Sequence, residues 1–377
     1  MLDGRSQALE SVVTRIRTLS LALVALAPLA AYADITIDEL VAETGIEAAA
    51  SPVREAPRWK APKTVIVRGY EDYVAGLSDA VSGVRLVPAS SYAEALAAAG
   101  DADGIIGFCN PELLAAAPRV SWVQIFSSGA ERCLAADEVA SGDVVLTNMQ
   151  KMSSPIIGEH AVAMMLSLTR GLTQLAKHMP GGEWDRDLRV APNAMALQDR
   201  TMLVVGLGGI GRETAVRANA LGMRVIATRN SSRTGPDYVD YVGLSDELLE
   251  LAAQADVIVN ALPLTPATEY VFSEAFFDAA KEGAIFITVG RGRSTDTDAL
   301  VAALESGKLS GAGLDVTDPE PLPADHPLWQ MDNVIITPHV AAFGGSSERH
   351  RLLVKENLRR FVAGDALYNV VDPAEGY

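Results

Sequence analysis

The sequence has few residues of the kinds that build metal sites, disulfide frameworks or nucleic-acid surfaces. Its 377 residues include two cysteines and five histidines. Cys109 and Cys133 lack the spacing of zinc ligands and are too few for a disulfide framework, so we expect no metal and assign neither cysteine to a site. Lysine and arginine number 31 against 48 acidic residues, a net charge of -17. This charge would repel a phosphate backbone, and we expect no nucleic-acid partner.

The apolar run near the amino terminus, LSLALVALAPLAAYA, is too short to predict a membrane span. It covers about 15 residues, whereas a spanning helix needs about 20. Two arginines precede it and AYA ends it, which is typical of a cleavable signal peptide over residues 1–33 and favours an exported, periplasmic protein. Asp3 and Glu10 are untypical of such a signal. A misassigned start or an uncleaved extension, and with it a cytoplasmic protein, therefore stays open.

The rest of the chain predicts two α/β domains. Apolar residues make up 49% of the sequence, and this length typically forms about two domains. Residues 34–62 contain stretches rich in alanine and proline and are expected to form a linker. From Lys63 onward, β-branched runs such as TVIVR and DGIIGF alternate with Ala/Leu-rich stretches of helical period. This alternation predicts doubly wound parallel sheets with helices on both faces.

A glycine-rich turn opens the second half of the chain. The segment TMLVVGLGGIGRETAVRANALGMRVIATRN is predicted to form strand, turn, helix and strand, and its glycines fit the pattern G-x-G-x-x-G. Glycine permits the tight turn, close approach of backbone amides to a pyrophosphate, and packing of helix against strand. Four further runs bring the predicted strands of this half to six. The residues expected to contact a dinucleotide at this turn are Gly206, Gly208, Gly209, Ile210 and Gly211.

The end of the second strand predicts which dinucleotide binds. Counting 23 positions from Gly206 reaches Arg229, where an acidic residue would accept hydrogen bonds from the ribose of NAD. A guanidinium would instead pair with the 2′-phosphate of NADP. We therefore expect NADP as the preferred cofactor, with NAD left open if these are only solvated loop residues. The residues expected to complete the phosphate pocket are Asn230, Ser231, Ser232 and Arg233.

Three polar residues follow the last three predicted strands. Arg291 lies in VGRGRSTDTDAL, Glu320 in DVTDPEPLP and His339 in TPHVAAF. Ligands of open parallel sheets bind outside the carboxyl ends of the strands, so these side chains are expected to converge beside the nicotinamide. Taken singly, each is more typical of a loop. Their occurrence at three consecutive strand ends favours catalysis.

At these residues the sequence resembles the D-isomer-specific 2-hydroxyacid dehydrogenases. The resemblance runs from about Lys63 to Asp372 and includes SSGAERCL, VVGLGGIGRE, ALPLTPATE, VGRGRSTDTDAL, GLDVTDPEPLP and NVIITPHVA. It implies a Rossmann cofactor domain, residues 155–339, inserted into a flavodoxin-like substrate domain formed by residues 63–154 and 340–377. It also implies a homodimer, with the helix that begins at Pro155 among the contacts.

The resemblance implies hydride transfer between NADP(H) and a small 2-keto or D-2-hydroxy acid, with glyoxylate and hydroxypyruvate as first candidates. Arg291 would hold the substrate carboxylate through its donor fork. His339 would be the general acid in reduction and the base in oxidation. Glu320 would orient the histidine ring so that the proton is present when hydride moves.

Further contacts follow from the same resemblance. The backbone amides of Ser128, Gly129 and Ala130 are expected to bind the carboxylate. Lys151 replaces a residue that is usually small, and it would contact a second anionic group of the substrate unless it is only a surface lysine. The residues expected along the cofactor are Pro263, Thr265, Thr268 and Asp315.

Two other functions stay open from the sequence. A fold does not fix a function, so the chain could be an NADP-responsive sensor or binding protein without turnover. The complete set of arginine, glutamate and histidine argues against this. Formate or phosphite oxidation is the second rival, but the related formate dehydrogenases carry glutamine in place of Glu320.

Overall fold

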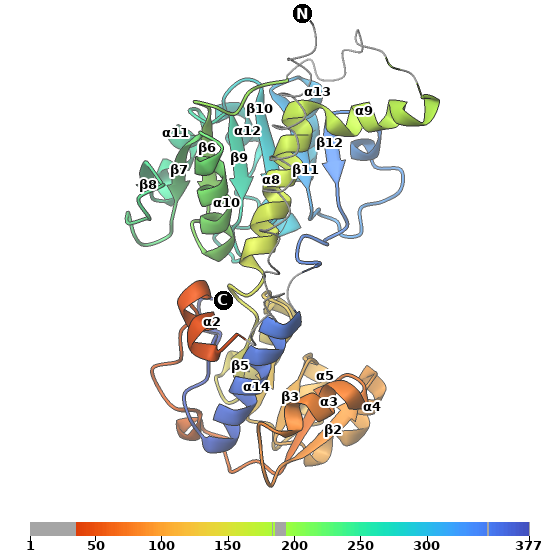
Figure 1. The fold of residues 1–377 in the computed structure, drawn as a ribbon, viewed down its shortest axis with the longest axis vertical. Coiled ribbons are helices and arrows are strands. Elements are labelled where there is room, and N and C mark those ends of the chain that lie inside the picture. The colour runs from red at the N-terminus through yellow and green to blue at the C-terminus, as the bar shows by residue number, and fades with distance from the viewer. Residues whose placement is uncertain (1–34, 183, 185–193, 345–346, 377) are drawn as a thin grey trace, which may run out of the picture.

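The computed structural model describes residues 35–182, 184, 194–344 and 347–376. Over these residues the chain forms two parallel sheets, each covered by helices, which lie one above the other along the long axis of the molecule (Figure 1). The expected signal peptide, residues 1–33, lies outside the described residues. Within the described part, no helix is both long and apolar enough to cross a membrane.

The first sheet has the strand order β2-β1-β3-β4-β5, which is the flavodoxin-like order. All four pairings are parallel. Its strands are β1 (Thr64–Arg68), β2 (Arg85–Ala89), β3 (Gly104–Ile106), β4 (Trp122–Gln124) and β5 (Val145–Thr147). The helices between and after them are α3 (Glu71–Ser78), α4 (Tyr92–Ala98), α5 (Pro111–Ala115), α6 (Glu131–Leu134) and α7 (Asp137–Ala140).

The second sheet has the order β12-β11-β10-β9-β6-β7-β8, again with parallel pairing throughout. Its strands are β6 (Thr201–Val205), β7 (Arg224–Thr228), β8 (Tyr241–Gly243), β9 (Val257–Asn260), β10 (Ala284–Thr288), β11 (Leu309–Leu314) and β12 (Val334–Ile336). The helices are α10 (Gly209–Ala220), α11 (Leu248–Ala252), α12 (Glu274–Ala279) and α13 (Thr297–Glu305). The predicted fold class, two doubly wound parallel-sheet domains, is confirmed.

The count of six strands in this half was wrong, because the described chain here has seven. The missed strand, β8, has only three residues and one of them is exposed, so it leaves no alternating or apolar run to recognise. It takes the third place of the order 3-2-1-4-5-6, and β12 extends the sheet at the opposite edge. Arg291, Glu320 and His339 consequently follow the fifth, sixth and seventh strands, and the expectation that they share one edge of the sheet is unaffected.

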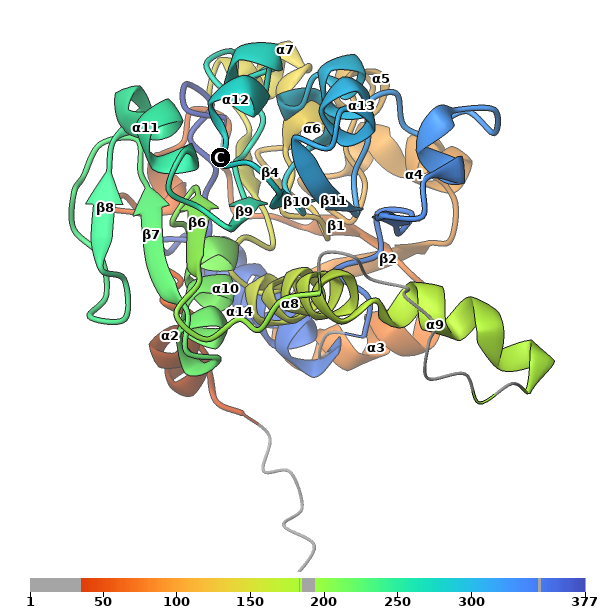
Figure 2. The ribbon, with the colours of Figure 1, turned by 90° about the horizontal axis from the view of Figure 1, so that it is seen from above.

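Continuous burial of the strands explains why these segments form parallel sheets. All residues of β6, β9 and β10 are buried, as strands with helices on both faces require. Helices α8 (Ser154–Arg170) and α10 cover one face of the second sheet, while α11, α12 and α13 cover the other (Figure 2). The sheet is thus enclosed, and its strand ends are left for binding.

Two helices connect the domains. Helix α8 leaves the first domain and packs on the second sheet, and α9 (Leu172–His178) projects from its end (Figure 1). Helix α14 (Ser347–Ala363) returns to the first domain. Its Phe361 is fully buried and its ring centroid lies 4.8 Å from that of Trp122 in β4. The chain therefore crosses between the domains twice, and the carboxyl-terminal residues complete the first core.

The segment expected to be a linker, residues 34–62, is instead a folded part of the first domain where the structure describes it. Helix α2 (Ile37–Thr44) begins with a capping box formed by Thr36 and Glu39. Leu40 is fully buried, and the backbone beyond the helix pairs with the end of the chain, with Ala49 N donating to Leu367 O at 2.8 Å. Composition alone suggested a linker. The residues that pair with this segment lie about 300 positions later in the chain, so no local pattern reveals the contact.

Cys109 and Cys133 form a disulfide between the loop after β3 and helix α6. The two residues are 24 positions apart, and their Cα atoms are separated by 5.4 Å. The sequence alone gave no reason to pair them. The bridge joins two segments beside the loop 128–130 but places no sulfur in the expected chemistry.

Candidate active site

The glycine turn after β6 has the geometry of a dinucleotide cradle. Gly206 has φ +96°, in the left-handed region that favours glycine. A Cβ on Gly211 would clash with the Gly206 carbonyl, so this position also requires glycine. A Cβ on Gly208, in contrast, would meet open space. Helix α10 then begins at Gly209 with no side-chain cap, so its first amides are available to a pyrophosphate. These residues fit a bound dinucleotide.

The loop after β7 holds the arginines expected at the adenosine ribose. Half-buried Arg229 donates from Nη1 to Thr234 O at 3.0 Å and makes no ion pair with a described carboxylate. Arg233 pairs with Glu247 at 2.7 Å and with the Tyr241 hydroxyl at 3.0 Å. Asn230 and Ser231 are exposed on the same loop. Arg229 is therefore the arginine that is available to a phosphate, whereas Arg233 already has an acidic partner.

A histidine and a glutamate meet at the carboxyl ends of the second sheet. Nδ1 of His339, just beyond β12, lies 2.7 Å from Oε1 of Glu320, which follows β11. Both side chains are about half exposed, at 49% and 44%. With Nδ1 engaged, Nε2 is the ring nitrogen left for another partner. This is the contact that the sequence predicted for the acid and its orienting carboxylate.

Asp315 holds the loop that carries His339. Its carboxylate is 3% exposed and accepts hydrogen bonds from Thr337 Oγ1 at 2.7 Å, from Val340 N at 2.9 Å and from Ala341 N at 3.1 Å. His339 itself has φ +55°, an uncommon conformation for a residue with a side chain. Sequence reasoning assigned Asp315 to the cofactor. The structure shows both of its oxygens engaged beneath the histidine loop, so it fixes where His339 lies.

His160 on α8 adds a second support to that loop. Its Nε2 lies 2.9 Å from Thr337 Oγ1 and 3.7 Å from Asp315 Oδ1. The sequence predicted only that His160 is a helix residue. Its contact with the loop after β12 was not predictable, because the two positions are 177 residues apart.

The side chain of Arg291 contacts residues of the other domain. It follows β10, yet a Cβ on Gly129 of the first domain would clash with Arg291 Nη2. Nη1 donates to the Gly290 carbonyl at 2.8 Å, and Nε pairs with Glu131 Oε1 at 2.9 Å. The loop is itself anchored, since Ser128 Oγ donates to Met149 O at 3.2 Å. Arg291 thus lies against the loop 128–130, and Glu131 is a residue of this contact that sequence reasoning missed.

The Lys151 ammonium is engaged with the segment after α2, and its expected contact with substrate stays a prediction. Its ammonium donates to the Gly45 carbonyl and lies 3.7 Å from Glu47 Oε1. The residue has φ +69°, and its Cγ would lie 3.4 Å from a Cβ placed on Gly209. The sequence did not indicate these two partners, the Gly45 carbonyl and the Glu47 carboxylate, which lie just beyond α2. Lys151 therefore ties that segment to the region of the glycine turn.

The loop after β9 forms a compact turn. Thr268 Oγ1 donates to Pro263 O at 2.7 Å and accepts from Thr265 N at 2.8 Å. Before the turn, the buried amide of Asn260 donates to Thr288 at 3.0 Å and to Ser294 at 2.7 Å. These bonds link the loop to the segment that carries Arg291. Three of the four residues expected along the cofactor, Pro263, Thr265 and Thr268, thus form one hydrogen-bonded turn.

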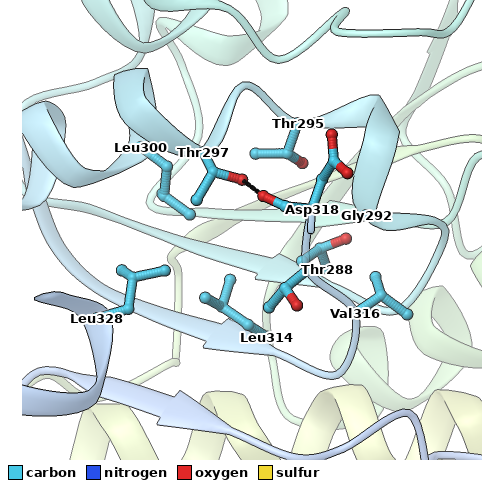
Figure 3. Close-up of a pocket in the computed structure, with 10 residues that line it drawn as sticks. Thr288, Gly292, Thr295, Thr297, Leu300, Leu314, Val316, Asp318 and Leu328 are labelled. Atoms are coloured by element: carbon cyan, nitrogen blue, oxygen red, sulfur yellow. Dashed lines mark hydrogen bonds between the residues drawn. The ribbon is translucent and has the colours of Figure 1, made fainter. Parts of the chain in front are cut away.

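A small cavity of about 10 Å³ is lined by Gly292 after β10 and by Val316 and Asp318 after β11 (Figure 3). Thr297 Oγ1 donates to Asp318 O at 2.6 Å across it, and the buried Thr295 Oγ1 has no hydrogen-bond partner among the described residues. A Cβ on Gly292 would clash with the Thr317 carbonyl, so the two loops touch. The cavity has room for about one water molecule and is not a substrate pocket. It belongs to the packing that sets the two loops beside each other.

Comparison with known proteins assigns a family to this arrangement. The model of the NAD binding domain of D-isomer specific 2-hydroxyacid dehydrogenases matches residues 162–341. The human glyoxylate reductase/hydroxypyruvate reductase is 33% identical over 238 residues, which cover 62% of this chain and 72% of that protein. The chain belongs to the D-isomer specific 2-hydroxyacid dehydrogenase family. The resemblance found in the sequence is confirmed.

Solved structures of this family agree over nearly their whole length. A family protein from Aeromonas salmonicida superposes with a TM-score of 0.73 at 32% identity, covering 82% of this chain and 99% of that one. The NADPH-dependent glyoxylate/hydroxypyruvate reductase from Sinorhizobium meliloti, in complex with NADP and sulfate, gives a TM-score of 0.71 at 29% identity over 84% and 100%. The dehydrogenase described here is thus an NAD(P)-linked hydroxyacid oxidoreductase.

Proposed function

We propose that this dehydrogenase reduces small 2-keto acids to D-2-hydroxy acids, with glyoxylate and hydroxypyruvate as the first substrates to test. The observation that carries the proposal is the 2.7 Å contact between His339 and Glu320 on the domain whose Arg291 reaches Gly129 of the other domain. An acid and an anion-binding group of the same domain are thereby held at the boundary with the other domain. The names of the human and Sinorhizobium meliloti relatives support the choice of acids.

Each residue has a separate task in reduction. The nicotinamide supplies a hydride to the carbonyl carbon when the reduced cofactor is bound. The guanidinium of Arg291 attracts the substrate carboxylate and polarises the keto oxygen. Nε2 of His339 donates a proton to that oxygen, and the same nitrogen accepts it in the reverse direction. The Glu320 carboxylate accepts a hydrogen bond from Nδ1–H, which fixes the tautomer and stabilises the protonated ring.

NADPH is the proposed electron donor, with NADH as the weaker alternative. Arg229 is half buried at the end of β7 and has no carboxylate partner among the described ion pairs, so a 2′-phosphate would gain a charge-assisted hydrogen bond there. An acidic residue that would select the free ribose of NAD is missing at this position. The relative from Sinorhizobium meliloti was solved with NADP, which supports the same choice.

The experiment is oxidation of NADPH and of NADH against a panel of 2-keto acids, with His339→Ala and Arg291→Ala as controls. The proposal expects reduction of at least one small 2-keto acid, faster with NADPH, and loss of turnover in both variants. A chain that binds NADPH but reduces no acid in the panel would be a binding protein instead. Unchanged rates in the histidine variant would remove its role as acid.

Dimer formation and export are separate proposals. Helix α9 projects from the body and exposes Leu172 and Leu175, and Met179 beyond it is 75% exposed (Figure 2). A second copy would cover these apolar side chains, and we therefore extend the proposed dimer contact from α8 to α9. Light scattering should give twice the chain mass.

Export through residues 1–33 would be seen as a shortened mature chain in the periplasm, whereas an unprocessed chain in the cytosol would refute it.

A further inference from the structure

Glu131 contacts Arg291 at the group that binds substrate in the proposed reaction. Its Oε1 lies 2.9 Å from Arg291 Nε, although the two residues belong to different domains and are 160 positions apart. Glu131 is the first residue of α6 and directly follows the loop 128–130. Its side chain is 45% exposed and that of Arg291 is 27% exposed. The pair is therefore accessible to solvent and to small anions.

The contact occupies one particular edge of the guanidinium. Nη1 is used by the Gly290 carbonyl, which leaves Nε and Nη2 as the fork that can bind a carboxylate with two parallel hydrogen bonds. Nε has Glu131 Oε1 as its partner. Nη2 and the other carboxylate oxygen both converge on Gly129, since a Cβ there would meet Arg291 Nη2 and would lie 2.6 Å from Glu131 Oε2. The side-on fork of Arg291 therefore holds a carboxylate of its own chain.

We propose that Glu131 is a specificity-determining residue that occupies the place of the substrate carboxylate on Arg291 and competes with it. The inference rests on the proposed function of Arg291. Two carboxylates cannot share one fork without repelling each other, so a substrate must displace Glu131 before it binds. The displaced side chain remains in water, where its charge is solvated. The competition makes binding of a keto acid weaker than the guanidinium alone would allow.

The absence of a side chain at position 129 permits this arrangement. Gly129 lets the guanidinium lie against the loop whose amides are expected to receive the carboxylate, so the internal and the external carboxylate reach the same place. Lys151 already has acceptors in its own chain, since its ammonium contacts Gly45 and Glu47. A small acid that binds to Arg291 therefore meets Glu131 at the Nε side of the fork.

The test measures anion binding without turnover. Oxalate, an unreactive analogue of glyoxylate, is titrated by calorimetry into the enzyme loaded with NADP⁺, using wild type, Glu131→Gln and Glu131→Ala. Loss of an exposed ion pair of this kind should tighten oxalate binding by about two- to fivefold, and the KM for glyoxylate should fall by a similar factor. The alanine variant separates release of Arg291 from any new hydrogen bond that the glutamine amide donates to the ligand.

Glu269→Gln is the matched control. Glu269 lies in the loop after β9 and pairs with Arg293, two positions from Arg291, so its loss removes the same charge near the Arg291 loop without freeing the catalytic arginine. We expect its oxalate affinity to stay at the wild-type level. Weaker or unchanged oxalate binding in Glu131→Ala would overturn the inference and make Glu131 a residue that positions Arg291. If wild type reduces no keto acid, the proposed function fails, while the oxalate titration still reports whether Glu131 competes for Arg291.

Discussion

Substitution of Arg229 by glutamine should remove the preference for NADPH. The guanidinium lies at the end of β7 and its contact to protein is one hydrogen bond to the Thr234 carbonyl, at 3.0 Å. Glutamine keeps a polar side chain of moderate length but carries no charge. The change therefore removes the attraction to the 2′-phosphate and leaves the glycine turn, which is shared by both dinucleotides, intact.

The magnitude follows from the bond that is lost. A hydrogen bond to a charged group contributes about 1.5–3 kcal/mol, and each 1.4 kcal/mol is about tenfold in affinity. The value of kcat/KM for NADPH should fall about 10- to 150-fold, with little change for NADH. Arg233→Gln should have a smaller effect, because Arg233 is already paired with Glu247 at 2.7 Å.

Steady-state rates with both cofactors, at one saturating keto acid concentration, measure this selectivity. The ratio of the two kcat/KM values cancels effects of the substitution on folding and on catalysis. Equal losses for NADPH and NADH would mean that Arg229 supports the loop rather than the phosphate. An unchanged ratio would refute its role in cofactor choice.

Four further outcomes are expected. His339→Gln should lower kcat by about 10²- to 10⁴-fold while NADPH still quenches protein fluorescence with wild-type affinity. In Asp315→Asn the amide NH₂ group would face backbone N–H groups that now donate to the carboxylate. We therefore expect kcat to fall, and urea denaturation should show that the free energy of unfolding is lower by about 1.5–3 kcal/mol. Leu40→Ala should lower the free energy of unfolding by about 2–5 kcal/mol in the same assay, because Leu40 is fully buried. A change near zero would mean that residues 34–62 are a linker after all. Burial raises the pKa of Asp256, but hydrogen bonds from Lys281 and the Thr201 amide outweigh it and hold this pKa below 3.8. Its stabilisation is therefore present above that pH and lost as the pH falls below it, so the melting temperatures of wild type and Asp256→Asn should converge in acid.

The glycine turn and the three strand-end residues were predictable because their signals are local. A G-x-G-x-x-G pattern between a strand and a helix carries its own geometry, and the carboxyl ends of parallel strands meet at one edge whatever the loops contain. The 2.7 Å contact of His339 with Glu320 follows from that rule. An error of one strand in the count did not affect it, because the last three strands kept their order.

Other features depend on partners far away in the sequence, and local patterns do not encode them. Helix α2 is stabilised against residues of the carboxyl terminus, Lys151 finds its acceptor 106 positions earlier, and Glu131 meets Arg291 across the domain boundary. The cofactor contact expected of Asp315 stays a prediction, and the fold adds that its carboxylate accepts hydrogen bonds from the loop that carries His339. Contacts between side chains at neighbouring strand ends were therefore predictable from the sequence. Contacts between segments that lie far apart in the chain were not.

The most direct test of the proposed chemistry is a single-turnover reaction of the NADPH-loaded enzyme with hydroxypyruvate, followed by chiral analysis of the product. We expect one equivalent of D-glycerate for each NADPH oxidised in wild type, and none on the same timescale in His339→Gln or Arg291→Ala. Formation of the L-isomer, or equal product yields in wild type and both variants, would contradict the assignment of Arg291 and His339 as the residues that bind the acid and deliver its proton.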